Sequence, residues 1–158
     1  MGGVRKLKAF YTVCIDSREQ NPYRFGVPHR RELADGGTIV TGLEEGDYAP
    51  MLDGVLLPVR IERKSLGDLY GGVGYGRGRG EAELDRLRLF RSWLIIEASI
   101  EQVRHGFERS SIPGEAAFAS VLCWSVRFSI APIFCQSWKM GNVVCARILE
   151  EFAVHSIK

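Results

Sequence analysis

Residues 61–68 read IERKSLGD, and this stretch decides how the chain is interpreted. It completes a β-prone segment, residues 55–63, which predicts a strand. Glu62 and Lys64 are two positions apart, so on a strand their side chains share one face. A hairpin turn upstream is expected to return Asp47 close to Glu62. The sequence therefore predicts two carboxylates and one amine on a single strand surface.

Such a group of side chains suits metal-assisted cleavage of a phosphodiester. Mg²⁺ takes oxygen ligands and keeps several waters, so one or two carboxylates plus a substrate phosphate suffice. A lysine beside them orients the attacking water or offsets negative charge. Taken alone, Glu62 and Lys64 are better explained as an exposed strand face with a weak ion pair. Their joint spacing with Asp47 and Asp68 favours the metal site.

A second acidic pair, Asp16 and Glu19, follows a short β-prone run at residues 11–15. Carboxylates at strand ends project into loops, where functional sites concentrate. If this pair approaches Asp47, four carboxylates crowd one site, and their repulsion is relieved only by cations. The alternative is that Asp16 caps a turn leading into Asn21-Pro22. Both explanations stay open on these residues alone.

Elsewhere the chain alternates strands with helices, which predicts one α/β domain over residues 1–158 with a mixed central sheet flanked by helices. An Asp53-Gly54 hairpin turn separates the extended segments 47–52 and 55–63. The expected elements, besides the strands already named, are a helical turn at 30–34, a β-rich segment at 38–43, a short helix from Ser65, a helix at 81–91, a strand at 93–97, helices at 100–107 and 113–128, a strand at 130–135 and a helix at 142–154.

Composition agrees with one globular domain. The 158 residues are 46% hydrophobic and 25% charged, with a net charge of +2. No apolar run reaches the roughly 18 residues of a membrane span, and no secretory signal is seen, so no membrane association is expected. The four cysteines lie far apart and read as buried thiols rather than zinc ligands. A reducing compartment is expected, the cytoplasm or, in a eukaryote, the nucleus.

Residues 71–80, GGVGYGRGRG, carry too many glycines for regular structure and predict a flexible loop. The segment is not a P-loop, because no lysine or hydroxyl follows Gly80. Beside a nuclease-like motif, the loop is expected to order on DNA. Arg77 and Arg79 would meet phosphates, and Tyr75 would stack on an unpaired base. A mobile, solvated loop with no such role explains the segment equally well.

Three segments together resemble the nuclease domain of the XPF-type structure-specific endonucleases. They are residues 15–19 (IDSRE), 45–48 (EGDY) and 61–68, which contain the signature G-D followed by E-R-K-x-x-x-D. Residues 93–98 also resemble that family's later strand ending in glutamate, so the motif-bearing core spans residues 10–98, with 99–158 completing the fold. The resemblance implies a restriction-endonuclease-like fold of the PD-(D/E)XK kind and a metal-dependent DNA endonuclease. It also implies a Mg²⁺ or Mn²⁺ requirement, branched, flapped or junction DNA as substrate, and a setting in DNA repair or recombination.

Carried over by position, the resemblance assigns Asp47 and Glu62 as the main metal ligands and as catalytic residues. Asp16 and Glu19 would complete or extend the metal site, through water where needed. Arg18, which lies between them, is a candidate DNA contact.

The same resemblance assigns the remaining motif positions. Lys64 would serve the attacking water and the charge of the transition state. Arg63, on the opposite strand face, would hold the scaffold or a backbone phosphate. Asp68 has two explanations of equal weight: it is catalytic, or it only caps the helix that begins after Ser65.

The sequence also departs from the family pattern. The best-known members add tandem helix-hairpin-helix modules, for which residues 99–158 offer no candidate, so a stand-alone member like those of phages or prophages is expected. DNA structure would then be read by a partner protein, a homodimer surface or the glycine-rich loop. The apolar stripe of Val144, Ile148 and Phe152 near Trp138 suits a dimer, although a core-facing helix explains it as well. Alternatives are an inactive DNA-binding or scaffold partner of a nuclease, and a Holliday-junction-resolvase or restriction-like nuclease of the same fold.

Overall fold

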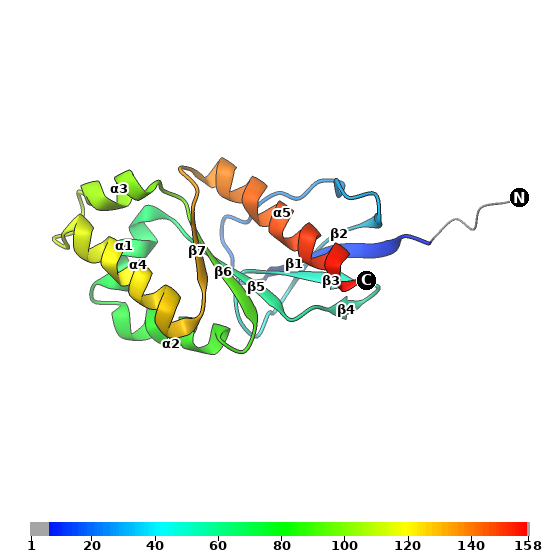
Figure 1. The fold of residues 1–158 in the computed structure, drawn as a ribbon, viewed down its shortest axis with the longest axis horizontal. Helices are drawn as coiled ribbons and strands as arrows, with labels where there is room; N and C mark the ends of the chain where they lie inside the picture. Colours follow the sequence, from blue (N-terminus) through cyan, green and yellow to red (C-terminus); the bar gives the residue numbers. More distant parts are fainter. Residues whose placement is uncertain (1–6, 158) are drawn as a thin grey trace, which may run out of the picture.

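A seven-stranded mixed β-sheet runs through the computed structural model, which describes residues 7–157 (Figure 1). The sheet order is β2-β1-β3-β5-β6-β7, with β4 paired to β3. The strands are β1 (Ala9–Asp16), β2 (Leu33–Thr41), β3 (Tyr48–Leu52), β4 (Val55–Leu56), β5 (Val59–Lys64), β6 (Arg91–Ile96) and β7 (Ala131–Phe134). The helices are α1 (Leu66–Val73), α2 (Arg77–Leu87), α3 (Ile100–His105), α4 (Gly114–Phe128) and α5 (Trp138–Ser156).

Antiparallel and parallel pairings divide this sheet. β3 is antiparallel to β1, β4 and β5, whereas β5, β6 and β7 run parallel to one another, as do β1 and β2. The turn between β3 and β4 has positive φ at both Asp53 (48°) and Gly54 (80°), as a two-residue hairpin requires. The predicted hairpin is thus confirmed, although the strand expected at 55–63 is divided into β4 and β5.

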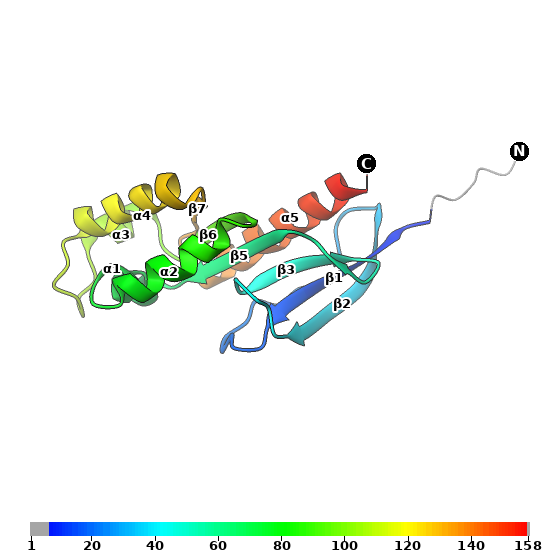
Figure 2. The same ribbon diagram turned by 90° about the horizontal axis from the view of Figure 1, so that it is seen from below.

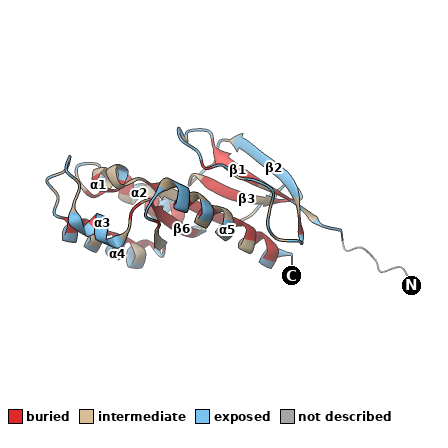
Figure 3. Cartoon of the chain, turned by 90° about the horizontal axis from the view of Figure 1, so that it is seen from above, coloured by how far each residue is buried: buried red, intermediate tan, exposed pale blue. Residues whose placement is uncertain are grey.

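Two hydrophobic cores lie on opposite sides of the sheet. α5 packs over β1, β3 and β5, burying Val13, Tyr48 and Ile61 among others. The helices α1, α2, α3 and α4 gather at the far end of β5 and β6 (Figure 2), around the buried Trp124. The colouring by burial in Figure 3 shows β1 and β3 largely enclosed and β2 exposed. This arrangement confirms the predicted mixed α/β sheet flanked by helices.

The glycine-rich segment differs from its prediction, because most of residues 71–80 are helical. α1 continues to Val73, and α2 begins at Arg77 after a short turn. The glycines at this turn permit a close approach: a Cβ at Gly74 would lie 2.9 Å from Ile112, and one at Gly76 would lie 2.9 Å from the Gly71 carbonyl oxygen. Low helix propensity is therefore overridden by packing between α1 and α2.

Two smaller expectations also change, and one of two open alternatives is favoured. The predicted helical turn at 30–34 gives way to β2, which begins at Leu33 and pairs parallel to β1. Cys123 is exposed on α4, whereas the other three cysteines are buried thiols as expected. The stripe of Val144, Ile148 and Phe152 on α5 is half-buried against the sheet core, which accounts for it without a dimer. No helix within residues 7–157 combines the length and apolarity needed to cross a membrane.

A glycine substitution tests the helical assignment of the glycine-rich segment. Gly78 lies in α2, and a Cβ there meets nothing within 4 Å. We expect Gly78→Ala to raise the free energy of unfolding by about 0.5–1 kcal/mol in a urea titration, because alanine loses less backbone entropy in a helix. The matched variant Gly76→Ala should instead destabilise by about 1–3 kcal/mol. Destabilisation by Gly78→Ala would contradict the helix.

Candidate functional site

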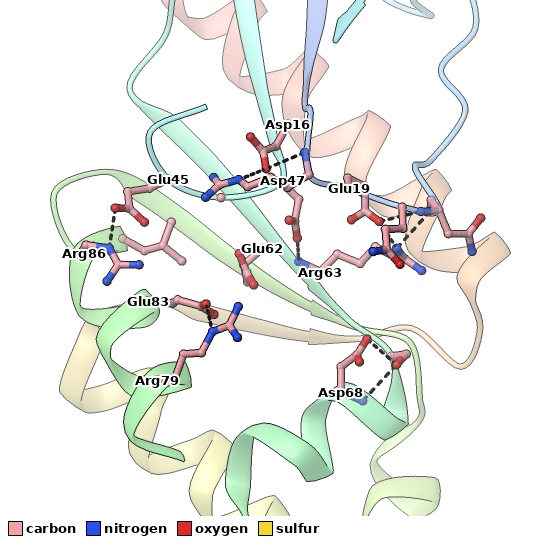
Figure 4. A pocket seen from close by; sticks show the side chains of 16 residues that line it. Asp16, Glu19, Glu45, Asp47, Glu62, Arg63, Asp68, Arg79, Glu83 and Arg86 are labelled. Atoms are coloured by element: carbon pink, nitrogen blue, oxygen red, sulfur yellow. Dashed lines mark hydrogen bonds and ion pairs between the residues drawn. The ribbon is translucent and has the colours of Figure 1, made fainter. Parts of the chain in front are cut away.

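A polar cavity of about 470 Å³ opens where β5 leaves the sheet toward α1 and α2 (Figure 4). It brings together most of the residues singled out in the sequence, Arg79 included, and it adds Glu83, Arg86 and Leu87 from α2. Lys64, Tyr75 and Arg77 are not part of its lining. The lining residues are Asp16, Arg18, Glu19, Gln20, Asn21, Glu45, Gly46, Asp47, Glu62, Arg63, Ser65, Asp68, Arg79, Glu83, Arg86 and Leu87.

Asp47 is fastened to β5 on both sides of Glu62. Its backbone N–H donates to the Ile61 carbonyl oxygen at 2.8 Å, and its Oδ2 accepts from the Arg63 backbone N–H at 2.8 Å. Gly46, just before it, has φ of 77° and lies against Arg60, so the chain turns sharply onto the strand. The two carboxylates that the sequence predicted to be adjacent are adjacent.

Burial shapes the electrostatics of this pair. It raises the pKa of Asp47 to about 8, with a further rise from the nearby charge of Glu62. Burial likewise raises the pKa of Glu62. For Lys64, burial is the largest influence and acts to lower the pKa. The negative charges of Glu62, 3.3 Å from Nζ, and of Glu83 and Asp47 together outweigh burial, so the pKa lies above its ordinary value. The site thus holds an ammonium beside two carboxyl groups that resist joint ionisation.

Arg63 points to the opposite face of β5, as its position on the strand predicted. Its guanidinium forms ion pairs with Glu97 and with Glu19, the latter at 2.9 Å, and it lies 5.2 Å from the Tyr23 ring centroid. The Tyr23 hydroxyl donates to Glu97 at 2.8 Å. Arg63 therefore ties the end of β6 to the loop after β1, which is a scaffold role.

Asp16 and Glu19 are engaged with other partners. Asp16 is 3% exposed; its Oδ1 accepts from the Leu43 N–H at 3.0 Å and its Oδ2 from Arg18 Nε at 2.7 Å. Burial raises its pKa, but these hydrogen bonds outweigh that and leave the pKa below its ordinary value. Glu19 pairs with Arg63.

The place of Asp16 and Glu19 in a metal site stays a prediction, because all four carboxylates line one cavity but these two have arginine partners. Within residues 7–157, no group of three or more His, Cys, Asp or Glu side chains could hold a metal ion on its own. Asp47 and Glu62 are electrostatic neighbours. Asp16 closes the turn that was its alternative explanation, since its Oδ2 accepts from the Arg18 backbone N–H at 3.3 Å and its carbonyl oxygen from the Glu19 N–H at 3.0 Å. Arg18 and Arg63 supply cations to the two outer carboxylates, so no shared ion is needed to offset their charge.

Asp68 takes part in the cap of α1. Its backbone N–H donates to Ser65 Oγ at 3.1 Å, and the Ser65 hydroxyl donates to Asp68 Oδ2 at 2.7 Å. The carboxylate also lines the cavity. Asp68 therefore has the predicted role in the helix cap. Because it also lines the cavity, a catalytic role stays a prediction.

Two charged α2 residues, Glu83 and Arg86, were not anticipated as parts of the site. Glu83 lines the cavity with its i,i+4 partner Arg79, and its charge raises the pKa of both Glu62 and Lys64 after their larger causes. Arg86 forms a 2.6 Å ion pair with Glu45 across the opening. The i,i+4 spacing of Arg79 and Glu83 indicates that the two side chains share one helix face. The prediction of a loop at residues 71–80 left that spacing out of account.

The donor set fits a small divalent cation. Mg²⁺ and Mn²⁺ prefer carboxylate oxygens, and Mg²⁺ keeps several waters, so two protein carboxylates suffice when phosphate supplies further oxygens. A cation between Asp47 and Glu62 would also relieve the repulsion that raises the pKa of Asp47.

Comparison with known proteins places the fold. No protein-family model and no curated protein matches the chain. Among solved structures, the fold of this chain has counterparts. It is similar to XPF from Aeropyrum pernix, with a TM-score of 0.63 and 19% identity over 90% of this chain, and to XPF from Aeropyrum pernix in complex with DNA, with the same TM-score and identity over 92%. This chain spans 65% and 66% of those two chains.

The strained carboxylate pair should destabilise the metal-free protein. The Asp47 carboxyl binds its proton up to about pH 8 when folded but only to about pH 4 when unfolded, so stability falls as pH rises between these values. We expect Asp47→Asn, which keeps an oxygen for the Arg63 N–H, to stabilise the protein by about 1–2 kcal/mol at pH 8, and by less at pH 5.

Urea titrations in EDTA at both pH values measure this difference. Glu108→Gln, which changes an exposed carboxylate outside the cavity, is the matched control and should leave stability unchanged. Equal stability of Asp47→Asn and the wild-type protein at pH 8 would contradict the strain at this pair.

Proposed function

We propose that the chain is a divalent-metal-dependent endodeoxyribonuclease that hydrolyses phosphodiester bonds. The observation that carries the proposal is the attachment of Asp47 to β5 on both sides of Glu62, with Lys64 against Glu62. Paired carboxylates at an open polar cavity, with an amine beside one of them, are what such a reaction needs. The fold shared with XPF, which has been solved in complex with DNA, supports the same function.

Asp47 and Glu62 are the residues that would hold Mg²⁺ or Mn²⁺. When bound, the ion polarises the phosphate and lowers the pKa of an attacking water. Asp16 and Glu19 lie at the same cavity but keep their arginine partners, so any contribution to the ion runs through water. The metal requirement itself is part of the proposal.

Lys64 and Arg63 divide two tasks between the faces of β5. We assign Lys64, whose Nζ is 3.3 Å from Glu62, to orienting the water and offsetting charge in the transition state. Arg63 is a positioning residue, because its guanidinium is already ion-paired with Glu97 and Glu19. Asp68 would add a negative charge at the opposite wall while it caps α1.

DNA would reach the cavity between Arg18 and Arg79. Their side chains are 71% and 89% exposed. The exposed Arg79–Glu83 pair contributes little, so the Arg79 guanidinium can exchange to a phosphate. Arg18 keeps its bonds to the buried Asp16 and to the Leu43 carbonyl oxygen, and would offer its remaining N–H groups to a phosphate. Arg77 is held by Glu81 and Ser120, and Tyr75 is fully exposed but outside the cavity. Tyr75 and Arg77 stay candidate DNA contacts outside the cavity.

The finer features belong to the proposal as well. We propose branched, flapped or single-strand/duplex junction DNA as the preferred substrate, with a homodimer or a partner protein helping to recognise it. A setting in repair or recombination and a phage-like origin stay predictions. Comparing Holliday junctions, flaps and plain duplex as substrates separates this enzyme from a resolvase or a restriction-like nuclease.

One observation favours a second candidate, DNA binding without cleavage. Within residues 7–157 no three potential metal ligands cluster, so an ion would depend on water and substrate for its other ligands. Calcium separates the two functions, since a nuclease of this kind binds DNA in Ca²⁺ but cuts only in Mg²⁺ or Mn²⁺, whereas a binding protein cuts in none.

Substitution of the carboxylate pair tests the nuclease. We expect Asp47→Asn and Glu62→Gln each to lower the cleavage rate on a labelled flap substrate in Mg²⁺ by about a thousandfold or more, because each removes a metal ligand. Binding of the same DNA in Ca²⁺ should persist, since the arginines around the cavity are retained.

Glu108→Gln again serves as the matched control and should cut at the wild-type rate. Undiminished cleavage by either carboxylate variant, with nuclease contamination excluded by an active-site double variant, would remove the assignment. Absence of cleavage by the wild-type protein with every metal and substrate would favour the binding function.

A further inference from the structure

A second cavity, of about 540 Å³, adjoins the carboxylate cavity. It is lined by Asn21, Pro22, Tyr23, Arg24 and Trp138, and Asn21 lines both cavities. Arg63 joins the two, because its backbone N–H donates to Asp47 Oδ2 and its guanidinium donates to the Asn21 carbonyl oxygen at 3.1 Å. A single residue, Arg63, therefore contacts a residue of the carboxylate cavity and a residue of the second cavity.

Trp138 is held in a fixed orientation at this second cavity. Its Nε1 donates to the Asn21 carbonyl oxygen at 3.3 Å, and its ring meets Tyr23 edge-on, with centroids 5.5 Å apart. Gly141 sits one turn along α5, where a Cβ would lie 2.3 Å from the Tyr23 hydroxyl oxygen, so the helix start is pressed against that ring. With its one N–H satisfied, the indole offers the cavity only aromatic surface.

Two polar side chains at the same cavity have no partner within the described part of the chain. The Arg24 backbone is anchored by two 3.0 Å hydrogen bonds with the Asn142 side chain, but its exposed guanidinium forms no ion pair there. The Asn21 backbone is fully used, donating to Glu19 and accepting from Arg63 and Trp138, while its side-chain amide is free. Because both backbones are held by hydrogen bonds, the unpaired Arg24 guanidinium and the unpaired Asn21 amide both lie at the second cavity.

We propose that this cavity is a subsite for one unpaired nucleobase of the DNA strand that passes the carboxylate pair. The base would stack on Trp138, the Asn21 amide would hydrogen-bond its edge, and Arg24 would meet the adjoining phosphate. The inference rests on the proposed function, because it assumes that the strand crosses the carboxylate cavity.

A subsite of this kind gives the protein a way to recognise DNA structure. A base within a duplex presents only its groove edges, so its face reaches an indole only after unpairing and unstacking. DNA that is already single-stranded next to the cut bears no such cost. The subsite therefore favours strands with unpaired nucleotides beside the scissile phosphate, without reading a sequence.

Tryptophan fluorescence tests the stacking directly. We expect hexathymidylate (dT6) in Ca²⁺ to quench the fluorescence of the wild-type protein, and Trp138→Phe to remove that quenching, since Trp124 is fully buried. Trp93→Phe is the matched control and should leave the quenching in place. Quenching that survives Trp138→Phe, or equal quenching by free thymidine monophosphate, overturns a strand subsite at Trp138.

Affinity measurements test the polar contacts without disturbing the core. We expect the double variant Asn21→Ala/Arg24→Ala to bind a duplex with a single-stranded tail about tenfold more weakly in Ca²⁺, and a blunt duplex as the wild-type protein does. Phe10→Ala, which removes an exposed aromatic on β1, should change neither affinity. Equal losses on both DNAs, or none, contradict the subsite.

These outcomes are separable from those of the proposed function, because they need no cleavage. A protein that never cuts but loses dT6 quenching with Trp138→Phe keeps the subsite and loses the nuclease. A protein that cuts, but whose double variant binds tailed and blunt DNA in the wild-type ratio, keeps the nuclease and loses the subsite.

Discussion

The attachment of Asp47 to β5 is the constraint on which the rest of the site depends. The Asp47 backbone N–H donates to Ile61, just before Glu62, and its carboxylate accepts from the Arg63 backbone N–H, just after Glu62. Hydrogen bonds to the backbone of β5, rather than side-chain packing, therefore place Asp47 beside Glu62. Partly buried carboxylates placed this way repel each other and resist joint ionisation. The fold tolerates the strain because two hydrophobic cores, one on each side of the sheet, supply stability elsewhere.

Cations around this pair are distributed by strand geometry. Lys64 shares the face of Glu62 and is nearly buried against it, whereas Arg63 points the other way and joins Glu97, Glu19 and Tyr23. The same alternation that places an amine at the carboxylates thus supplies a scaffold behind them. The second cavity begins on that scaffold, since Arg63 holds the Asn21 carbonyl oxygen that also accepts from Trp138.

How far the sequence predicted this structure depends on the range of the interactions involved. The hairpin at Asp53-Gly54, the strand face shared by Glu62 and Lys64, and the cap at Ser65 follow from local geometry, and they were predicted. The helical state of residues 71–80 was not, because contacts of Gly74 and Gly76 with distant or turn atoms decide it. Asp16 was expected at a shared ion, but its partner is the neighbouring Arg18, and the place of Glu83 depends on how α2 docks.

The pairing between β3 and β5 has its own consequence. Tyr48 and Ile61 are the one register pair that joins these strands, whereas β5 and β6 match over six positions. The strand ladder is therefore shortest where the two carboxylates meet, and beyond that register pair it is continued by the hydrogen bonds of Asp47 to Ile61 and Arg63. Breathing motions of the native state should begin at that seam, and amide protons there should exchange with solvent sooner than those deeper in β5 and β6. Local motion of this kind would let the edge that carries Asp47 and Glu62 adjust its spacing while both hydrophobic cores stay intact.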